Sequence, residues 1–254
     1  MHLALVLGSG GPRGFSHVGV LKALHEIGVR YDLMVGASVG ALLGAVACAG
    51  APMAQIEELA LDFDFRSLFL LSLTGGVRLS GRQLGSFVNQ EVQRRAGTTA
   101  LEKLPKRFAA VAFDETAGQA VVFNAGDVGR AVQASCAIPG RFDAVEIRGR
   151  RHVDPDQHAP MPVRLARSMG ARRVIALDCS ARVENAPPGA AAYRESDLRK
   201  RALVAEDARY ADLVIHPEIG YWVSVTREYR ERTMRAAYEQ TLSMRSEIRR
   251  SAGL

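Results

Sequence analysis

Two strand-loop-helix units occupy the first 50 residues and restrict what this chain can fold into. Each has a short apolar run, at residues 3–7 and 31–35, then a glycine-rich turn and an apolar helix, at residues 15–27 and 39–49. Apolar runs bounded by glycine are typical of strands buried on both faces of a parallel sheet. Because the carboxyl ends of parallel strands share one edge of the sheet, we expect both turns to line one crevice.

The second turn carries a serine between two glycines, in the stretch Val-Gly-Ala-Ser-Val-Gly-Ala at residues 35–41. Flanking glycines let the backbone reverse sharply, so that the hydroxyl of Ser38 stands exposed above a strand-to-helix turn. The helix that follows has free N–H groups and a partial positive charge at its start, which would favour a developing oxyanion. A glycine-serine turn that only caps a helix is the alternative.

The first turn, Gly-Ser-Gly-Gly-Pro-Arg-Gly at residues 8–14, opens two alternatives. A glycine loop before a helix can cradle a dinucleotide, and Asp32 lies about 20 residues further on. The strict G-x-G-x-x-G pattern fails at Arg13, although Gly8, Gly10 and Gly14 fit a looser spacing. Alternatively, the loop amides point at the oxygen of an ester carbonyl that Ser38 attacks.

Composition excludes several classes of protein. With 254 residues, 48% hydrophobic and 24% charged, the chain has the composition of one soluble domain. The net charge of +6 is spread over scattered basic residues, which permits phospholipid headgroups as partners but gives no compact patch for nucleic acid. The three cysteines, at positions 48, 136 and 179, are too far apart for a disulfide framework or a zinc site, so we expect a reducing compartment.

Two apolar stretches need an interpretation. Residues 33–56 carry no charge, but glycines, Ser38 and Pro52 interrupt them, so a strand and a buried helix account for them better than a membrane span. Residues 63–73 form either core or a hydrophobic wall over an acyl-chain site. The start of the chain enters a strand without a basic region, which argues against a secretory signal and favours a cytoplasmic protein.

Further strands are predicted at 108–113, 119–123, 144–147, 151–153, 174–178 and 213–216, and helices at 51–61, 81–95 and 127–135. Residues 186–192 read as a surface loop. Residues 224–250 read as an arginine-rich helix that either packs on the body or lies on an anionic membrane surface. We therefore expect one domain, residues 1–254, with residues 224–254 as a C-terminal helix packed on it.

A pair of carboxylates, Asp154 and Asp156, follows the predicted strand at 151–153. Acidic residues placed after a strand and before a helix can reach the crevice at the strand ends. One possibility is a Ser-Asp-His triad, because Ser38, Asp154 and either His158 or His216 occur in the order that α/β-hydrolases use.

With these residues in view, nearly the whole chain resembles the patatin-like phospholipase family in its small bacterial form. The family's glycine loop, G-G-G-x-R-G, corresponds to residues 9–14, which read Ser-Gly-Gly-Pro-Arg-Gly, and its G-x-S-x-G motif matches residues 36–40. A block similar to A-S-x-A-x-P-x-x-F follows at residues 134–142. The fourth block departs from the pattern, because the family has D-G-G or D-G-A where this chain has Asp154-Pro155-Asp156.

The resemblance implies a three-layer αβα fold with a mostly parallel central sheet. It also implies a serine acyl hydrolase acting on (phospho)lipid esters through a Ser38-Asp154 dyad, with no cofactor and no metal. The oxyanion loop would comprise Gly10, Gly11, Pro12, Arg13 and Gly14. A lipid or acyl-ester substrate is the expected partner, with peripheral contact to the inner membrane as a further option.

The altered fourth block leaves alternatives open. Proline fixes φ and lacks an N–H, so the approach of Asp154 to Ser38 could differ from that in the family. Asp156 is a substitute base, a negative neighbour that raises a pKa, or a turn residue. Arg13 either braces the glycine loop or pairs with a carboxylate. A lipid-binding protein of this fold with impaired catalysis is the main alternative to an enzyme, and a nucleotide-binding protein is a weaker one.

Overall fold

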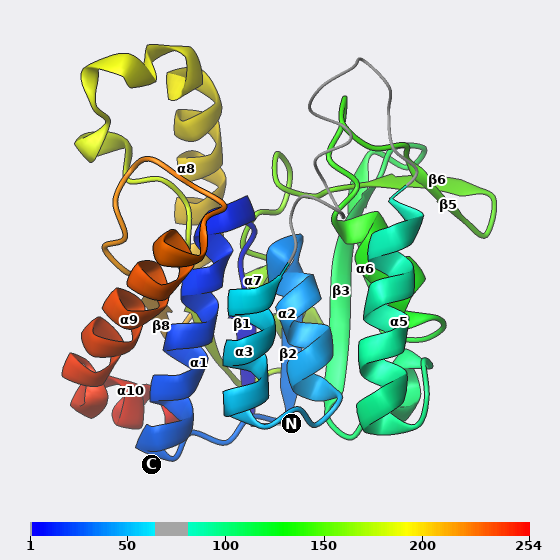
Figure 1. The fold of residues 1–254 in the computed structure, drawn as a ribbon, viewed down its shortest axis with the longest axis horizontal. Helices are drawn as coiled ribbons and strands as arrows, with labels where there is room; N and C mark the ends of the chain where they lie inside the picture. The colour runs from blue at the N-terminus through cyan, green and yellow to red at the C-terminus, as the bar shows by residue number, and fades with distance from the viewer. Residues whose placement is uncertain (1, 64–80) are drawn as a thin grey trace.

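The computed structural model describes residues 2–63 and 81–254, which form a central sheet between two layers of helices (Figure 1). The sheet of the described residues has the order β5-β6-β3-β2-β1-β7-β8, with β4 paired to β3. Its strands are β1 (Leu3–Leu7), β2 (Leu33–Ala37), β3 (Arg107–Asp114), β4 (Gln119–Phe123), β5 (Val145–Ile147), β6 (Arg150–Val153), β7 (Arg173–Leu177) and β8 (Leu213–Ile215). Five neighbouring strands, β3, β2, β1, β7 and β8, are parallel to one another. The strands β4 and β6 pair antiparallel with β3, and β5 pairs antiparallel with β6.

Alternation along the strands divides the core into two halves. Leu3, Leu5 and Leu7 of β1 belong to one buried cluster, whereas Ala4 and Val6 belong to the cluster on the opposite face. The first face is covered by α1 (Ser16–Ile27), α2 (Val39–Cys48), α3 (Met53–Asp62), α5 (Arg82–Ala96), α6 (Val128–Ser135), α9 (Arg227–Ser243) and α10 (Arg245–Ala252). The second is covered by α7 (Val163–Ser168) and α8 (Arg194–Ala208).

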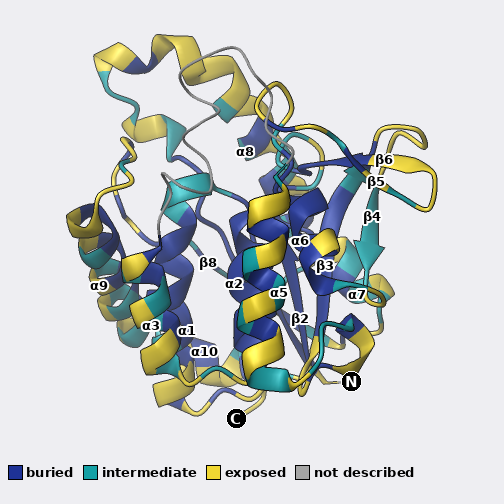
Figure 2. Ribbon diagram, turned by 45° about the vertical axis from the view of Figure 1, so that its right-hand side comes forward, coloured by how far each residue is buried: buried dark blue, intermediate teal, exposed yellow. Residues whose placement is uncertain are grey.

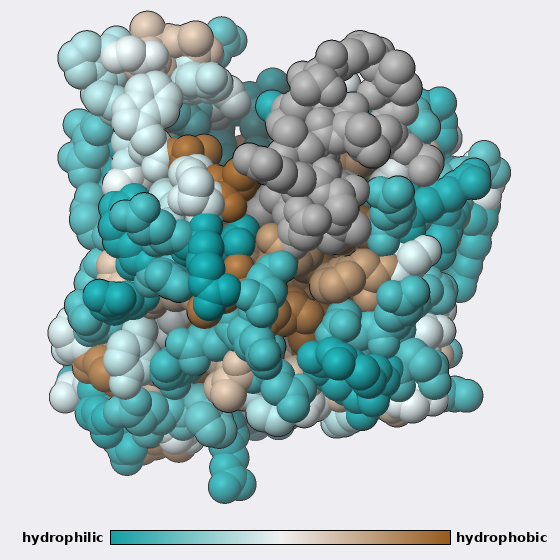
Figure 3. Space-filling view, viewed as in Figure 1, coloured by the Kyte–Doolittle hydropathy of each residue, from teal (hydrophilic) through white to brown (hydrophobic). Residues whose placement is uncertain are grey.

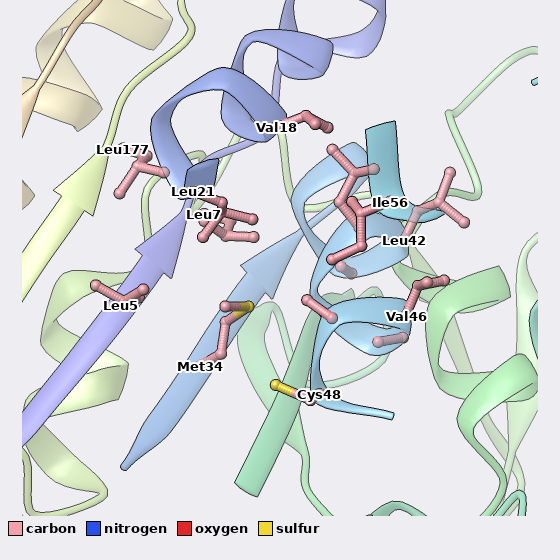
Figure 4. Close-up of a cluster of buried hydrophobic side chains, with 14 of the residues drawn as sticks. Leu5, Leu7, Val18, Leu21, Met34, Leu42, Val46, Cys48, Ile56 and Leu177 are labelled. Carbon is pink, nitrogen blue, oxygen red and sulfur yellow. The ribbon is translucent and has the colours of Figure 1, made fainter. Parts of the chain in front are cut away.

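The helix α2 lies at the centre of the molecule and is buried along its whole length, whereas α5 in front of it has an exposed outer face (Figure 2). Leu42 and Val46 of α2 pack with side chains of β1, β2 and α1 and with Ile56 of α3 (Figure 4). A helix of small and apolar residues fits such a central place because no polar side chain has to be buried. The turn at its N-terminus is therefore held in a rigid framework.

Strand pairing brings β6 to the carboxyl end of β2. The pairing of β2 with β3 ends at Ala37 and Val111. Two residues further along β3, Phe113 pairs with Val153, the last residue of β6. The residues that follow β2 and β6 therefore emerge at the same edge of the sheet, at the upper end of the molecule in Figure 1.

The structure confirms the predicted three-layer fold with a mostly parallel sheet. The second strand begins at Leu33, later than predicted, and the carboxylate of the preceding Asp32 accepts hydrogen bonds from the N–H groups of His2 and Leu3 at the start of β1. The predicted C-terminal helix is two helices, α9 and α10, which meet at Met244. The apolar stretch 63–73 lies, apart from Phe63, outside the described residues.

The helix α9 packs alongside α1 and is tied to α3 (Figure 1). The buried guanidinium group of Arg230 donates hydrogen bonds to the carbonyl oxygens of Leu61 and Phe63, 2.6 Å and 3.2 Å away. The hydroxyl of Tyr238 donates to Glu26 of α1 at 2.6 Å. These contacts place the arginine-rich helix on the body of the protein. In the described part of the chain, no helix has the length and apolarity that a membrane span requires.

Candidate active site

Ser38 is the single residue between β2 and α2, and its backbone is strained. Its φ of 54° and ψ of −122° lie in a region that residues other than glycine rarely adopt. Such a conformation costs on the order of 1–3 kcal/mol and persists only where the surroundings enforce it. The strained strand-to-helix turn sets the serine hydroxyl at the edge of the sheet, as the sequence pattern predicts.

The two glycines of the motif are required by close backbone contacts. A Cβ atom on Gly36 would lie 2.4 Å from the carbonyl oxygen of Gly40, and one on Gly40 would lie 2.2 Å from the carbonyl oxygen of Leu7. Neither neighbour can move away easily, because both oxygens belong to the backbone of packed elements. The glycines thus allow β1, β2 and α2 to approach closely enough to form the turn.

Replacing Gly40 with alanine is expected to destabilise the protein by about 1–3 kcal/mol, because the added methyl group overlaps the backbone of Leu7. The measurement is thermal unfolding followed by circular dichroism. Gly189→Ala is the matched control, since a Cβ at Gly189 would meet only the ring of Trp222 at an ordinary 3.6 Å. An equal Tm for the two variants would contradict the close approach of α2 to β1.

The hydroxyl of Ser38 donates a hydrogen bond to Oδ2 of Asp154 at 2.6 Å. Both residues are buried, with 7% and 3% of their surface exposed. The other carboxylate oxygen, Oδ1, accepts from the backbone N–H of Asp156 at 2.9 Å, and the N–H of Asp154 donates to Ala137 at 3.0 Å. The proline at position 155 therefore does not prevent Asp154 from reaching Ser38.

The carboxyl group of Asp154 has an unusual proton affinity. Burial, followed by the negative charge of Asp156, raises the pKa of Asp154 to about 7, and the hydrogen bond from Ser38 opposes the rise. A carboxylate with its ordinary pKa is a weak base toward a hydroxyl, so this shift makes Asp154 a stronger one. The arrangement combines an oriented hydroxyl with a base of suitable strength.

A second serine fixes the turn. The N–H of Ser38 donates to Oγ of Ser135 at 2.8 Å, and Oγ of Ser135 donates to the carbonyl oxygen of Val111 at 2.5 Å. Ser135 is fully buried at the end of α6. The sequence places it in the block at 134–142 but does not reveal that it binds the backbone of Ser38.

The glycine loop lies beside this turn. It begins after β1 and forms a short 3-10 helix, η1 (Gly11–Phe15). The N–H groups of Gly10 and Gly11 donate to no other group among the described residues. A Cβ atom on Gly14 would lie 2.1 Å from the side chain of Val39, so the loop packs directly on the residue after Ser38.

Pro12 and Arg13 of the glycine loop do not offer a free backbone N–H group. Pro12 has no N–H to offer, and the N–H of Arg13 donates within the loop to Gly10 at 3.1 Å. The guanidinium group of Arg13 donates to the carbonyl oxygen of Tyr221 and lies 5.7 Å from the centre of its ring. Of the two roles considered for Arg13, the structure thus favours the bracing of the glycine loop, because its side chain connects that loop to segment 217–226.

Asp156 lies close to Ser38 and Asp154, but its carboxylate faces Ser9 and Lys200. Its Oδ1 atom accepts from the hydroxyl of Ser9 and from the ammonium group of Lys200, each at 2.5 Å. No hydrogen bond joins it to Ser38 within the described residues. These contacts do not support Asp156 as a substitute base, and its charge does raise the pKa of Asp154. Lys200 was not predicted, since a single lysine in a charged helix gives no sequence signal.

Neither candidate histidine contacts Ser38. The ring of His158 is exposed and stacks on Phe113, with the ring centres 3.6 Å apart. His216 lies 3.2 Å from the Asp178 carboxylate through Nδ1 and 3.1 Å from the carbonyl oxygen of Ser180 through Nε2. The geometry therefore gives no support to a Ser-Asp-His triad.

The structure also weakens the nucleotide alternative. Asp32, the acidic residue expected on a ribose, lies at the start of β2, so it is at the opposite end of the strands from the glycine loop. Within residues 2–63 and 81–254, no group of three or more histidine, cysteine or acidic side chains is arranged to hold a metal ion.

The fold and the site together define the class of this protein: an α/β protein with a glycine loop and a hydrogen-bonded serine-aspartate pair at the carboxyl edge of its sheet. The model of the patatin-like phospholipase family matches residues 5–166. This chain belongs to the patatin-like phospholipase family.

Relatives and solved structures agree with this assignment. An uncharacterised NTE-family protein of Mycobacterium tuberculosis is 35% identical over 175 residues, which cover 69% of this chain and 48% of that protein. The human patatin-like phospholipase domain-containing protein 6 is 34% identical over 188 residues, covering 72% of this chain and 14% of that protein. The chain thus spans about half or less of the length of these relatives.

Among solved structures, VipD from Legionella pneumophila superposes with a TM-score of 0.66 and 14% identity, covering 96% of this chain and 66% of that one. The type III effector ExoU superposes with a TM-score of 0.56 and 15% identity, covering 99% of this chain and 53% of that one. At such low identity, these likenesses concern the fold.

Proposed function

We propose that this chain is a serine acyl hydrolase that cleaves fatty-acyl esters of lipids, with Ser38 as the nucleophile and Asp154 as the general base. The hydrogen bond of 2.6 Å between the Ser38 hydroxyl and the Asp154 carboxylate carries the proposal. Membership of the patatin-like phospholipase family supports it. The atypical Asp-Pro-Asp turn is compatible with catalysis, because it leaves this contact in place.

In the proposed reaction, Oγ of Ser38 attacks the ester carbonyl carbon while its proton passes to Asp154. The resulting oxyanion accepts hydrogen bonds from the N–H groups of Gly10 and Gly11, which are otherwise unused in the described structure. The ester C–O bond then breaks, and Asp154 returns the proton to the departing alcohol. Water attacks the acyl-enzyme by the same route, which releases the fatty acid and restores Ser38.

Apolar side chains near the site support an acyl substrate. Figure 3 shows hydrophobic side chains across the middle of this face of the molecule. Val223 and Val225 are 44% and 40% exposed in segment 217–226, the segment that Arg13 ties to the glycine loop. Exposed apolar side chains in a segment that is bonded to the glycine loop suit the acyl chain of a lipid better than a small polar ester.

The proposal is tested with the purified chain on p-nitrophenyl butyrate and octanoate, and on phosphatidylcholine vesicles with release of free fatty acid as the readout. Hydrolysis of the octanoate ester and of the vesicle lipid supports a lipid acyl hydrolase. If no ester is cleaved and a fluorophosphonate probe does not label the protein, the site is not catalytic. The alternative of a lipid-binding protein with impaired catalysis would then be preferred.

Alanine variants of the histidines are expected to retain hydrolysis. His158 stacks on Phe113, and His216 contacts Asp178 and Ser180, so neither can relay a proton from Ser38 in this structure. We expect kcat/KM of His158→Ala and His216→Ala on p-nitrophenyl butyrate to stay within about threefold of that of the unmodified protein, far from the loss expected for a general base. A loss of several orders of magnitude in a folded His variant would instead point to a triad.

A further inference from the structure

A buried lysine from the opposite helical layer reaches the turn that holds Asp154. Lys200 of α8 is 9% exposed, and its ammonium group lies 2.5 Å from Oδ1 of Asp156 and 3.2 Å from the carbonyl oxygen of Ser9. Oδ1 of Asp156 also accepts from the hydroxyl of Ser9 at 2.5 Å. The three residues thus join the glycine loop, the Asp154 turn and α8.

We infer that Lys200 is a positioning residue of the proposed active site, which anchors Asp156 and, together with it, sets the orientation and charge environment of Asp154. The inference rests on the proposed function and goes beyond it, because Lys200 touches neither Ser38 nor a substrate. It also lies outside residues 5–166, the part of the chain that the family model matches.

The backbone provides the first link. Asp154 Oδ1 is held by the N–H of Asp156 at 2.9 Å, and the intervening Pro155 cannot donate a hydrogen bond. The Asp156 side chain is anchored by Lys200 and Ser9, and this anchor restrains the residue whose N–H holds Asp154. The family pattern has glycine or alanine at this position, so neither the carboxylate nor a cation to pair with it is needed there.

Charge provides the second link. A carboxylate in this partly buried position is costly unless a cation pairs with it. Burial alone would raise the pKa of Asp156, but the charge of Lys200 and its hydrogen bond lower it, so Asp156 is ionised at neutral pH. The negative charge of Asp156 raises the pKa of the neighbouring Asp154, and the positive charge of Lys200 opposes that rise.

Three of the other titratable groups around these residues, Cys136, Cys179 and His17, are uncharged near neutral pH. Burial raises the pKa of Cys136, which faces Asp154, and it raises the pKa of Cys179, which faces Lys200, to about 12. Burial also lowers the pKa of His17 to about 4, so its ring is neutral. The Asp178 carboxylate also faces Lys200 and lies 3.2 Å from Nδ1 of His216, and the guanidinium group of Arg13 faces Cys179. Asp156 and Lys200 are thus the charges whose removal should change Asp154 most.

The test is the pH dependence of kcat/KM on p-nitrophenyl butyrate for Asp156→Asn, Lys200→Met and the double variant. Asp156→Asn removes the negative charge beside Asp154 and is expected to move the acidic limb of the pH profile of kcat/KM to lower pH by about one unit. Lys200→Met removes the cation and is expected to move the limb to higher pH by a similar amount. The double variant removes both charges and should bring the limb back toward its original position.

Lys22→Met is the matched control, because Lys22 forms a surface ion pair with Glu57 at 2.9 Å on α1 and α3. Its pH profile should match that of the unmodified protein. A purely structural Lys200 would lower Tm and reduce kcat/KM equally at every pH, with no shift of the limb. That result, or shifts of the same sign in Asp156→Asn and Lys200→Met, would overturn the inference. If one of the two single variants does not fold, the direction in which the other moves the acidic limb tests the inference.

A readout without turnover separates this inference from the proposed function. The carboxyl carbon of Asp154, assigned by its loss in Asp154→Asn, is titrated by 13C NMR in the unmodified protein and in the two single variants. Opposite shifts of its titration midpoint support the link from Lys200 even if no ester is cleaved, in which case the proposed function alone fails. Unchanged midpoints contradict the link even in an active enzyme.

Discussion

Replacing Ser38 with alanine is expected to reduce kcat for ester hydrolysis by about 10⁴-fold or more, because the proposed reaction has no other nucleophile. The Ser38 hydroxyl is hydrogen-bonded to Asp154 at 2.6 Å, and alanine removes the attacking atom while leaving the glycine loop intact. Initial rates on p-nitrophenyl butyrate measure the loss. Labelling by a fluorophosphonate probe should disappear with it.

Ser168→Ala is the control for this prediction, since Ser168 is exposed and its hydroxyl only caps a carbonyl of its own helix, that of Leu165, at 2.8 Å. Its activity should equal that of the unmodified protein. Circular dichroism must show that Ser38→Ala is folded. A folded Ser38→Ala protein that retains more than about a tenth of the rate would exclude Ser38 as the nucleophile, because loss of a nucleophile costs orders of magnitude.

Asp154→Asn is expected to lower kcat/KM by about 10²–10⁴-fold, the usual contribution of a general base. Asparagine keeps the shape of the side chain but cannot accept the proton of Ser38. In the unmodified protein, burial raises the pKa of Asp154 to about 7, so the carboxyl is protonated and inactive below that pH. Activity should therefore rise as the pH increases through about 7 and then level off. The residual activity of Asp154→Asn should lack this rise.

The control is Asp62→Asn, which alters a carboxylate with 60% of its side chain exposed, paired with Arg227 on the surface. Its pH profile and rate should be those of the unmodified protein. If Asp154→Asn retains full activity with the same acidic limb, another group is the base. The Ser38-Asp154 pair would then be structural only.

The local parts of the site could be predicted from the sequence. The G-x-S-x-G pattern after an apolar run requires a strand-to-helix turn, and the structure shows Ser38 in that turn with a φ of 54°. The apolar runs at β1, β2 and β7 indicate buried parallel strands because every residue of a doubly covered strand faces a helical layer. These features depend on neighbouring residues, so local patterns reveal them.

The rest of the site depends on long-range contacts that local patterns do not encode. Ser38 and Asp154 are separated by 116 positions, and their meeting depends on β6 pairing with β3 beyond the end of β2. In advance, the two residues were linked by their order in the chain, as members of a possible triad, and by the resemblance to a family, which implied the dyad. The contact of Lys200 with Asp156 has no local pattern at all, because α8 reaches the turn from the other face of the sheet.

The most direct test of Ser38 as the nucleophile is to identify the residue that a fluorophosphonate probe modifies, by peptide mass spectrometry of the labelled protein. A single adduct is expected on the peptide that contains Ser38, formed more slowly in Asp154→Asn and absent in Ser38→Ala. An adduct on another residue, or undiminished labelling of Ser38→Ala, would contradict it.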